Sequence, residues 1–153
     1  MTELRYLIVD DSPTVRHLIV QALRTENVPD GQIAEADSAD RAIEAFDRVP
    51  PDVVFLDVSL TGGDVVAGGG YLDLLHPTGT RPESGNDVAR HMLSRNPALR
   101  IVVCTGNPPE DPRVRDLVRG GAFQVLQKPV HLAQIREVLR QIREEDREIH
   151  GPR

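Results

Sequence analysis

With 153 residues, of which 39% are hydrophobic and 27% charged, the chain is predicted to fold as one soluble domain with a proper core. Its formal net charge of −6 disfavours nucleic acid as the main partner, because phosphate backbones are bound by clustered Lys and Arg. One cysteine excludes an internal disulfide, no apolar run reaches the roughly 20 residues that span a membrane, and acidic residues come too early for a signal peptide, so the sequence predicts a cytoplasmic protein.

The first part of the chain alternates apolar strands with amphipathic helices. Residues 4–9 form a near-continuous apolar run, which is typical of parallel strands buried on both faces. Ser12 and Pro13 are typical of an N-cap and a first helical position, and apolar residues recur after them with helical spacing. The other elements expected here are a strand at 32–36, a helix that begins at Ser38, and a strand at 52–56.

The alternation lapses after the third strand and then resumes. Residues 58–84 contain the run Gly68-Gly69-Gly70 and show no sustained periodicity. The elements expected after them are a helix at 84–96, a strand at 100–104, a helix from Asp111-Pro112 to Gly120-Gly121, a strand at 123–126, and a last helix at 131–147. Five strands in strict alternation with helices predict an α/β, flavodoxin-like, doubly wound parallel sheet. The expected strand order is 2-1-3-4-5, with an insertion after strand 3.

Polar side chains follow the predicted strands at their carboxyl ends. Asp10 and Asp11 follow the first strand, and Asp57, Thr105 and Lys128 follow the third, fourth and fifth. Doubly wound sheets bind ligands at this edge. Three crowded carboxylates repel one another, and a hard divalent cation such as Mg²⁺ relieves that repulsion. A metal, a carboxylate nucleophile, a hydroxyl and an ammonium together are typical of phosphoryl transfer.

Each of these residues has a simpler explanation when it is taken alone. Asp10 or Asp11 could cap the first helix, Asp57 could cap a turn, and Thr105 could form a local bond at a strand end. Lys128 could be an ordinary surface residue. It is, however, the only lysine among 18 basic residues, which indicates a position that needs a compact ammonium. The coincidence of one such residue at each correct strand end favours a site.

The motifs Asp10-Asp11, Phe55-Leu56-Asp57, Thr105-Gly106 and Lys128-Pro129 together resemble the signature of response-regulator receiver domains of two-component systems, in particular stand-alone, chemotaxis-regulator-like ones. The resemblance implies that Asp57 takes a phosphoryl group from a histidine kinase or a histidine phosphotransfer protein. It also implies that Asp11, Asp57 and the Ser59 carbonyl ligate Mg²⁺, with Asp10 acting through water. Lys128 would pair with one phosphoryl oxygen, Thr105 would swing to bond another, and the Lys128-Pro129 bond would be cis.

The sequence departs from the family pattern in three ways. Val125 stands where the family usually carries an aromatic ring that reorients with the threonine. The segment after Asp57 is longer than usual, because Gly85 best matches the glycine that opens the third helix. Third, the receiver domain is expected at 1–147 with a tail at 148–153 and no output domain after it. We therefore expect a signalling domain that acts on an unknown downstream protein or in a phosphorelay, and that is not an enzyme beyond assisting its own phosphorylation and dephosphorylation.

Two other functions are compatible with this pattern. One is a receiver-shaped interaction module that works without phosphorylation, which Val125 favours and the intact Asp57, Thr105 and Lys128 disfavour. The other is a phosphatase of the haloacid-dehalogenase type, which also uses an Asp nucleophile. That class needs a second acid two residues after the nucleophile, where this chain has Ser59.

Two segments are candidates for contacts with partners. The insertion at 61–83 begins close to Asp57 and is predicted to control access to it, with a passive insertion as the alternative. The last helix carries an apolar stripe with a/d spacing, formed by Leu132, Ile135, Leu139, Ile142 and Ile149. Most of this stripe must cover the sheet, but a projecting end could pair with a second chain. The expected state is a monomer or a weak dimer.

Overall fold

The computed structural model of the protein describes residues 3–60 and 84–151. Its strands are β1 (Tyr6–Val9), β2 (Ile33–Ala36), β3 (Val53–Leu56), β4 (Arg100–Thr105) and β5 (Gln124–Gln127). Its α-helices are α1 (Pro13–Thr25), α2 (Ala39–Arg48), α4 (Gly85–Arg95), α5 (Pro112–Arg119) and α6 (Leu132–His150), and a short 3-10 helix spans Asp30–Gln32. Every predicted element is present, with ends that differ by at most three residues from those expected from the sequence.

The helix starts follow from local side-chain chemistry. The hydroxyl of Ser12 accepts a hydrogen bond from the Val15 N–H at the start of α1, and Pro13 occupies the first turn. Ser38 and Ser84 cap α2 and α4 in the same way, and the Asp111 carboxylate caps α5. These caps satisfy N–H groups that have no partner inside the helix, so short polar side chains determine where each helix begins.

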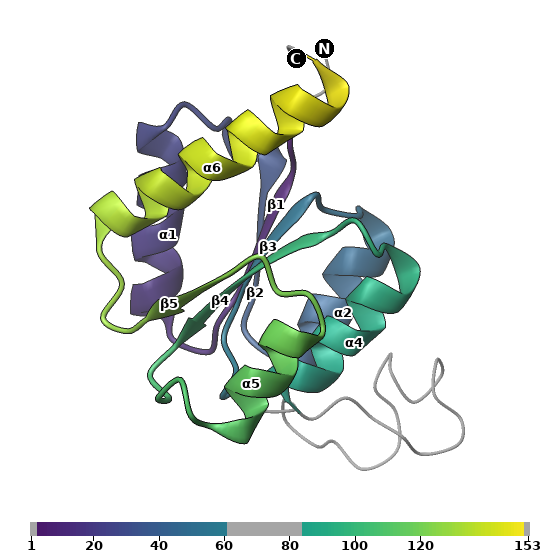
Figure 1. Cartoon of the computed structure of the whole chain (residues 1–153). Coiled ribbons are helices and arrows are strands. Elements are labelled where there is room, and N and C mark those ends of the chain that lie inside the picture. The colour runs from purple at the N-terminus through teal and green to yellow at the C-terminus, as the bar shows by residue number, and fades with distance from the viewer. Residues whose placement is uncertain (1–2, 61–83, 152–153) are drawn as a thin grey trace.

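The five strands form one parallel sheet in the order β2-β1-β3-β4-β5, as predicted (Figure 1). The register pairs Val9 of β1 with Leu56 of β3, and Leu56 with Val103 of β4. Strands that are paired this way end at the same edge of the sheet. The residues that follow Val9, Leu56 and β4 therefore emerge side by side.

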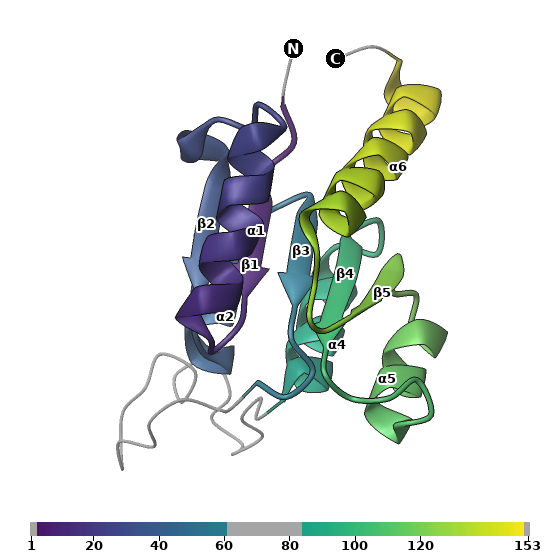
Figure 2. The same cartoon turned by 90° about the vertical axis from the view of Figure 1, so that its left-hand side faces the viewer.

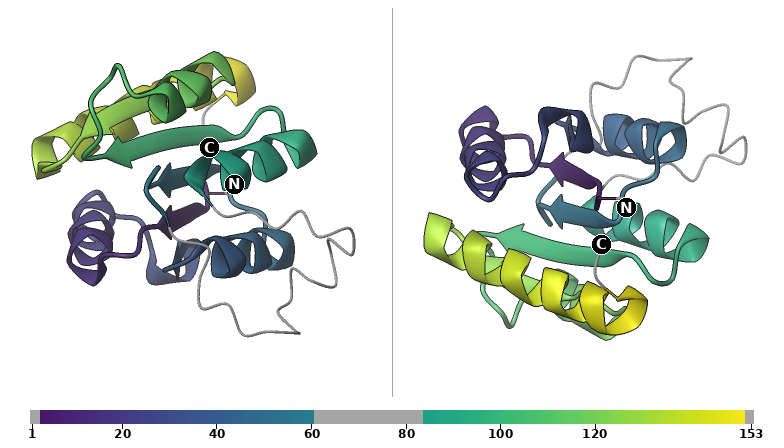
Figure 3. Two further views of the ribbon diagram at one scale, coloured as in Figure 1. Left: turned by 90° about the horizontal axis from the view of Figure 1, so that it is seen from below. Right: turned by 90° about the horizontal axis from the view of Figure 1, so that it is seen from above.

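Helices cover both faces of the sheet, which explains why its strands are apolar on both sides (Figures 1 and 3). On one face, α1 and α6 bury side chains such as Ile19, Leu23 and Leu139 against β1, β3 and β4. On the other face, α2, α4 and α5 form a second apolar cluster, to which Ile43 and Met92 belong. None of the helices formed by the described residues is both long and apolar enough to cross a membrane.

The apolar stripe of α6 is divided between the core and the surface. Ile135, Leu139 and Ile142 are fully buried, which confirms that most of the stripe covers the sheet. Leu132 and Ile149, at the two ends of the helix, are 47% and 61% exposed. The helix continues to His150, past the expected end at Arg147, and its last turns lie beyond the start of β3 and β4 (Figure 2). Pairing of this end with a second chain stays a prediction.

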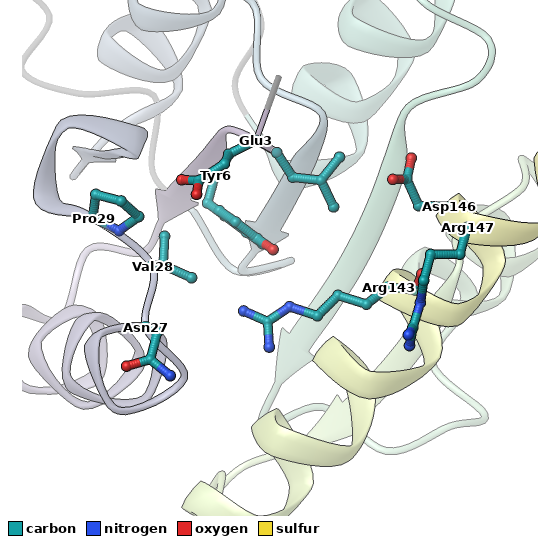
Figure 4. A pocket seen from close by; sticks show the side chains of 9 residues that line it. Glu3, Tyr6, Asn27, Val28, Pro29, Arg143, Asp146 and Arg147 are labelled. Atoms are coloured by element: carbon teal, nitrogen blue, oxygen red, sulfur yellow. The ribbon is translucent and has the colours of Figure 1, made fainter. Parts of the chain in front are cut away.

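A cavity of about 310 Å³ lies where α6 passes the start of β1, at the edge of the sheet opposite the strand carboxyl ends (Figure 4). Arg143 reaches across it from α6, and its Nη2 donates to the Glu26 carbonyl at the end of α1 over 2.7 Å. Burial raises the pKa of the Tyr6 hydroxyl in its wall above the ordinary value, although the nearby Arg143 guanidinium partly opposes that rise. Arg143 therefore ties α6 to α1 and β1.

We expect Arg143→Met to lower the free energy of unfolding by about 1–2 kcal/mol, because the Glu26 carbonyl loses a charged donor while the methylene packing is kept. Urea denaturation followed by circular dichroism measures the change. The matched control is Arg140→Met on the same helix, whose exposed ion pairs with Glu137 and Glu144 contribute little. Equal midpoints for the two variants would show that the Arg143 contact does not stabilise the fold.

Candidate functional site

Three carboxylates meet at the carboxyl ends of β1 and β3. Each of Asp10, Asp11 and Asp57 places one carboxylate oxygen within 4.8 Å of the other two. Asp10 and Asp57 are only 1% and 3% exposed, whereas Asp11 lies at the surface. The register of β1 with β3 brings Asp10 beside Asp57 across a gap of 47 residues in the chain. The predicted acidic cluster is therefore present.

The backbone and its neighbours hold Asp10 in one orientation. Its N–H donates to the Ala36 carbonyl over 3.1 Å, which extends the pairing of β1 with β2 by one residue. Its Oδ1 accepts from the Ser12 N–H over 2.9 Å. Its Oδ2 is buried and lies 2.9 Å from the Lys128 Nζ. That oxygen therefore already faces one positive charge.

Asp57 is held in a similar way from the other strand. Its N–H donates to the Val9 carbonyl over 3.0 Å, and its Oδ1 accepts from the Ser59 N–H over 3.0 Å. Its carbonyl lies against Gly85, where an added Cβ would come within 2.3 Å of that oxygen. The predicted match of Gly85 to the glycine at the start of the next helix thus has a steric reason, since a side chain there would collide with the Asp57 backbone.

Lys128 neutralises part of the charge on the two buried carboxylates. Its Nζ lies 2.9 Å from Asp10 Oδ2 and 3.3 Å from Asp57 Oδ2. Burial alone would lower the pKa of the ammonium, but the two carboxylates outweigh burial and raise that pKa above its ordinary value. The Lys128 N–H donates to the Thr105 carbonyl over 2.8 Å, and the Lys128-Pro129 peptide is cis, as the resemblance implies. The alternative of an ordinary surface lysine is wrong.

Thr105 ends β4, on the strand next to Asp57, and is fully buried. Its Oγ1 accepts from the Asn107 N–H over 2.9 Å, so the local strand-end bond that we considered is present. A hydroxyl that accepts one hydrogen bond can still donate another, and this bond leaves the Thr105 proton available. The adjacent Cys104 belongs to the core, and burial, with a smaller contribution from the Asp10 carboxylate, raises the pKa of its thiol to about 12.

Two side chains that the sequence analysis did not single out are tied to this site. Asn107 accepts from the Ser59 hydroxyl over 3.2 Å, and its Nδ2 donates to the Asp111 carboxylate over 3.1 Å, so it joins the loop after β3 to the cap of α5. Arg16 donates from Nη1 to the Asp10 carbonyl over 2.6 Å. Asn107 could have been noticed as a polar residue two positions after Thr105. Arg16 is one of many arginines in the sequence, and no sequence signal distinguishes it.

The structure describes two residues of β5 and its approach, but it does not describe the insertion after Asp57. Val125 is half-buried and packs against the cluster beneath α2, α4 and α5, so β5 carries no aromatic ring at this position. Phe123 packs against the other cluster, as expected of a core residue. The segment at 61–83, which is predicted to control access to Asp57, lies outside the described residues.

The donor set fits a hard divalent cation. Carboxylate oxygens such as those of Asp10, Asp11 and Asp57 are the ligands that Mg²⁺ prefers, and one oxygen of each residue lies within 4.8 Å of the other two. The single ammonium of Lys128 does not balance three negative charges. Ser59, whose carbonyl is the remaining expected ligand, lies beside the cluster because its N–H bonds to Asp57.

A doubly wound parallel sheet with an acidic cluster and one lysine at its carboxyl edge defines a signalling domain of the receiver class. The family model of the response regulator receiver domain matches residues 6–79, and this match, together with the similar sequences and structures described below, supports a receiver domain of two-component signalling. Receiver domains are signalling modules and are generally not enzymes.

Known proteins with similar sequences support this assignment. The chain is 32% identical over 129 residues to the probable transcriptional regulatory protein TcrX of Mycobacterium tuberculosis, a match that covers 84% of this chain and 45% of that protein. It is 23% identical over 136 residues to the chemotaxis protein CheY of Listeria monocytogenes, covering 89% of this chain and 95% of that protein. The chain thus spans about half the length of the first relative and nearly all of the second.

Solved structures share the fold. The receiver domain of NtrX from Brucella abortus superposes with a TM-score of 0.68 at 22% identity, covering 89% of this chain and 95% of that one. The CheY-like receiver domain protein from Methanospirillum hungatei JF-1 superposes with a TM-score of 0.70 at 18% identity, covering 96% of both chains. At these identities the likeness confirms the flavodoxin-like fold.

Proposed function

We propose that the chain accepts a phosphoryl group on Asp57 from a phosphohistidine, in a reaction that depends on Mg²⁺. The observation that carries the proposal is the position of the Asp57 carboxylate, which lies among two further carboxylates and the Lys128 ammonium. A haloacid-dehalogenase-type phosphatase is disfavoured, because the exposed Ser59 stands where that class needs a second acid.

The chemistry follows from these neighbours. A carboxylate oxygen of Asp57 attacks the phosphorus, a new O–P bond forms, and the P–N bond to the histidine of the donor breaks, so that imidazole leaves. Lys128 already faces Asp57 Oδ2 and can follow the negative charge onto a phosphoryl oxygen. The Thr105 hydroxyl can donate to another such oxygen. When bound, Mg²⁺ supplies the positive charge that the three carboxylates and the phosphoryl group require.

The proposed ligands are Asp11, Asp57 and the Ser59 carbonyl, with Asp10 acting through water. The proposed donor is a histidine kinase or a histidine phosphotransfer protein, and the proposed output is a contact with a downstream protein or a step in a phosphorelay. We further propose that the chain acts in the cytoplasm as a monomer or a weak dimer.

Incubation with acetyl phosphate and Mg²⁺, followed by intact mass measurement, tests the proposal. We expect a gain of one phosphoryl group that disappears when EDTA removes the metal. A second function, that of an interaction module that works without phosphorylation, is favoured by Val125, because the half-buried valine lacks the ring that couples site and surface in the family. Absence of labelling together with retained partner binding would support that function instead.

We expect Asp11→Ala to abolish labelling while leaving the fold intact. Asp11 is exposed and contributes one oxygen to the acidic cluster. Its removal therefore takes one ligand from the cation and leaves the packing of the core unchanged. The control is Asp30→Ala, which removes an exposed carboxylate that pairs only with Arg24 among the contacts found at its side chain. Circular dichroism checks the fold of both variants. Labelling of Asp11→Ala at the normal rate would contradict the metal role.

A further inference from the structure

Arg16 has an unusual position for a charged residue on the first helix. Its guanidinium turns back from α1 towards the turn that carries Asp10 and Asp11, and Nη1 donates to the Asp10 carbonyl over 2.6 Å. Its Nε donates to Glu35 Oε1 on β2 over 3.3 Å. The side chain is only 18% exposed. Both contacts are long-range or cross-element ones, so Arg16 links β2, α1 and the β1–α1 turn.

The atom that Arg16 holds determines the direction of the next residue. The Asp10 carbonyl belongs to the planar peptide unit between Asp10 and Asp11, so an anchored oxygen fixes the plane from which Asp11 departs. The side chain of Asp10 has its own partners in Ser12 and Lys128. Asp11 is exposed and depends more on the backbone for its orientation.

Electrostatic repulsion also acts on the β1–α1 turn. Without a cation, the carboxylates of Asp10, Asp11 and Asp57 repel one another, and opening the β1–α1 turn would relieve that repulsion. A short, charge-assisted hydrogen bond to the backbone resists such opening. Because Arg16 is itself bonded within the first turn of α1, with its N–H donating to the Ser12 carbonyl, it holds the turn against a rigid element.

We propose that Arg16 is a positioning residue for divalent-cation binding, which keeps Asp11 directed into the acidic cluster, and that Glu35 orients its guanidinium. This inference rests on the proposed function, since it assumes that the cluster takes Mg²⁺. Residues of this kind, which hold ligands without touching the metal, typically alter metal affinity by 10–100-fold when they are replaced.

The sign of the effect separates this role from a purely electrostatic one. Replacing Arg16 by a neutral residue removes a positive charge beside a cation site, and Coulomb's law alone then predicts tighter Mg²⁺ binding. A positioning role predicts weaker binding, because the turn that carries Asp11 is released. The two effects have opposite signs, so the direction of the change in Mg²⁺ affinity shows which of them dominates.

The experiment measures the Mg²⁺ dissociation constant of the unphosphorylated full chain by isothermal titration calorimetry, with no phosphodonor present. We expect Arg16→Met to bind about tenfold more weakly than wild type. Arg16→Lys keeps the charge but loses the planar fork, so we expect weaker binding of the same kind, and it replaces Arg16→Met should that variant not fold. The control is Arg41→Met, an exposed arginine that pairs with Asp37, for which we expect no weakening.

A double variant tests the role of Glu35. If Glu35 acts through Arg16, adding Glu35→Gln to Arg16→Met should weaken Mg²⁺ binding no further, although Glu35→Gln alone weakens it. Melting curves in EDTA show whether each variant is folded at the titration temperature. Binding by Arg16→Met or Arg16→Lys that equals or exceeds wild type would overturn the inference while leaving the proposed function intact. Failure of wild type itself to bind Mg²⁺ would overturn the metal dependence of the proposed function, and the inference with it.

Discussion

Asp57→Asn is expected to abolish phosphorylation, so that its intact mass does not change under conditions in which wild type gains one phosphoryl group. The amide keeps the size of the side chain and can still accept from the Ser59 N–H, but it is too poor a nucleophile to attack phosphorus. Removing one negative charge also relieves its repulsion with Asp10. We therefore expect the fold to be kept and labelling to be lost.

Two comparisons make this result specific to Asp57. Asp30→Asn, an exposed carboxylate paired with Arg24 at the far end of α1, should label like wild type. Mass mapping of the labelled wild-type protein should locate the phosphoryl group in the peptide that contains Asp57. Labelling that persists in Asp57→Asn would place the acceptor elsewhere and remove the central assignment.

Gly85→Ala is expected to lower the free energy of unfolding by about 2–3 kcal/mol, which is a large effect for one methyl group. A Cβ at this position would lie 2.3 Å from the Asp57 carbonyl oxygen and 2.9 Å from the Val58 Cα. Both are backbone atoms of the strand end, so they cannot rotate away as a flexible side chain would. Either α4 or the backbone at Asp57 must shift, and a shift of Asp57 should also slow its phosphorylation.

Urea denaturation of Gly85→Ala and of the matched variant Gly31→Ala measures this effect. An added Cβ at Gly31 has no atom within 4 Å and its φ is ordinary, so this substitution should leave the stability unchanged or raise it slightly. A small loss for Gly85→Ala, no larger than that for Gly31→Ala, would mean that the start of α4 moves away from β3 at little cost.

Local patterns in the sequence determined the elements and their order. Ser12, Ser38 and Asp111 mark helix starts because a cap bonds to N–H groups within three residues of it, which is a contact that needs no distant partner. The apolar strands and the alternation with helices leave few arrangements, since right-handed parallel crossovers bring each strand back to the same edge. For that reason Asp10, Asp57, Thr105 and Lys128 could be placed together from their positions at strand ends.

Only the tertiary structure decided which atoms meet at that edge. The pairing of Lys128 with both Asp10 and Asp57 depends on the spacing of β1, β3 and β5, which no local pattern encodes. The contact of Gly85 with the Asp57 backbone depends in the same way on how closely α4 approaches β3.

Arg16 is the clearest example of a contact that the sequence does not predict. It is one of many arginines in the sequence, and its role follows from a guanidinium that turns back towards the Asp10 carbonyl and reaches Glu35 on another strand. Periodicity predicts which face of a helix is buried, because burial follows from the repeat of apolar residues. It does not predict the rotamer of a long polar side chain, because that choice depends on acceptors that packing brings within reach.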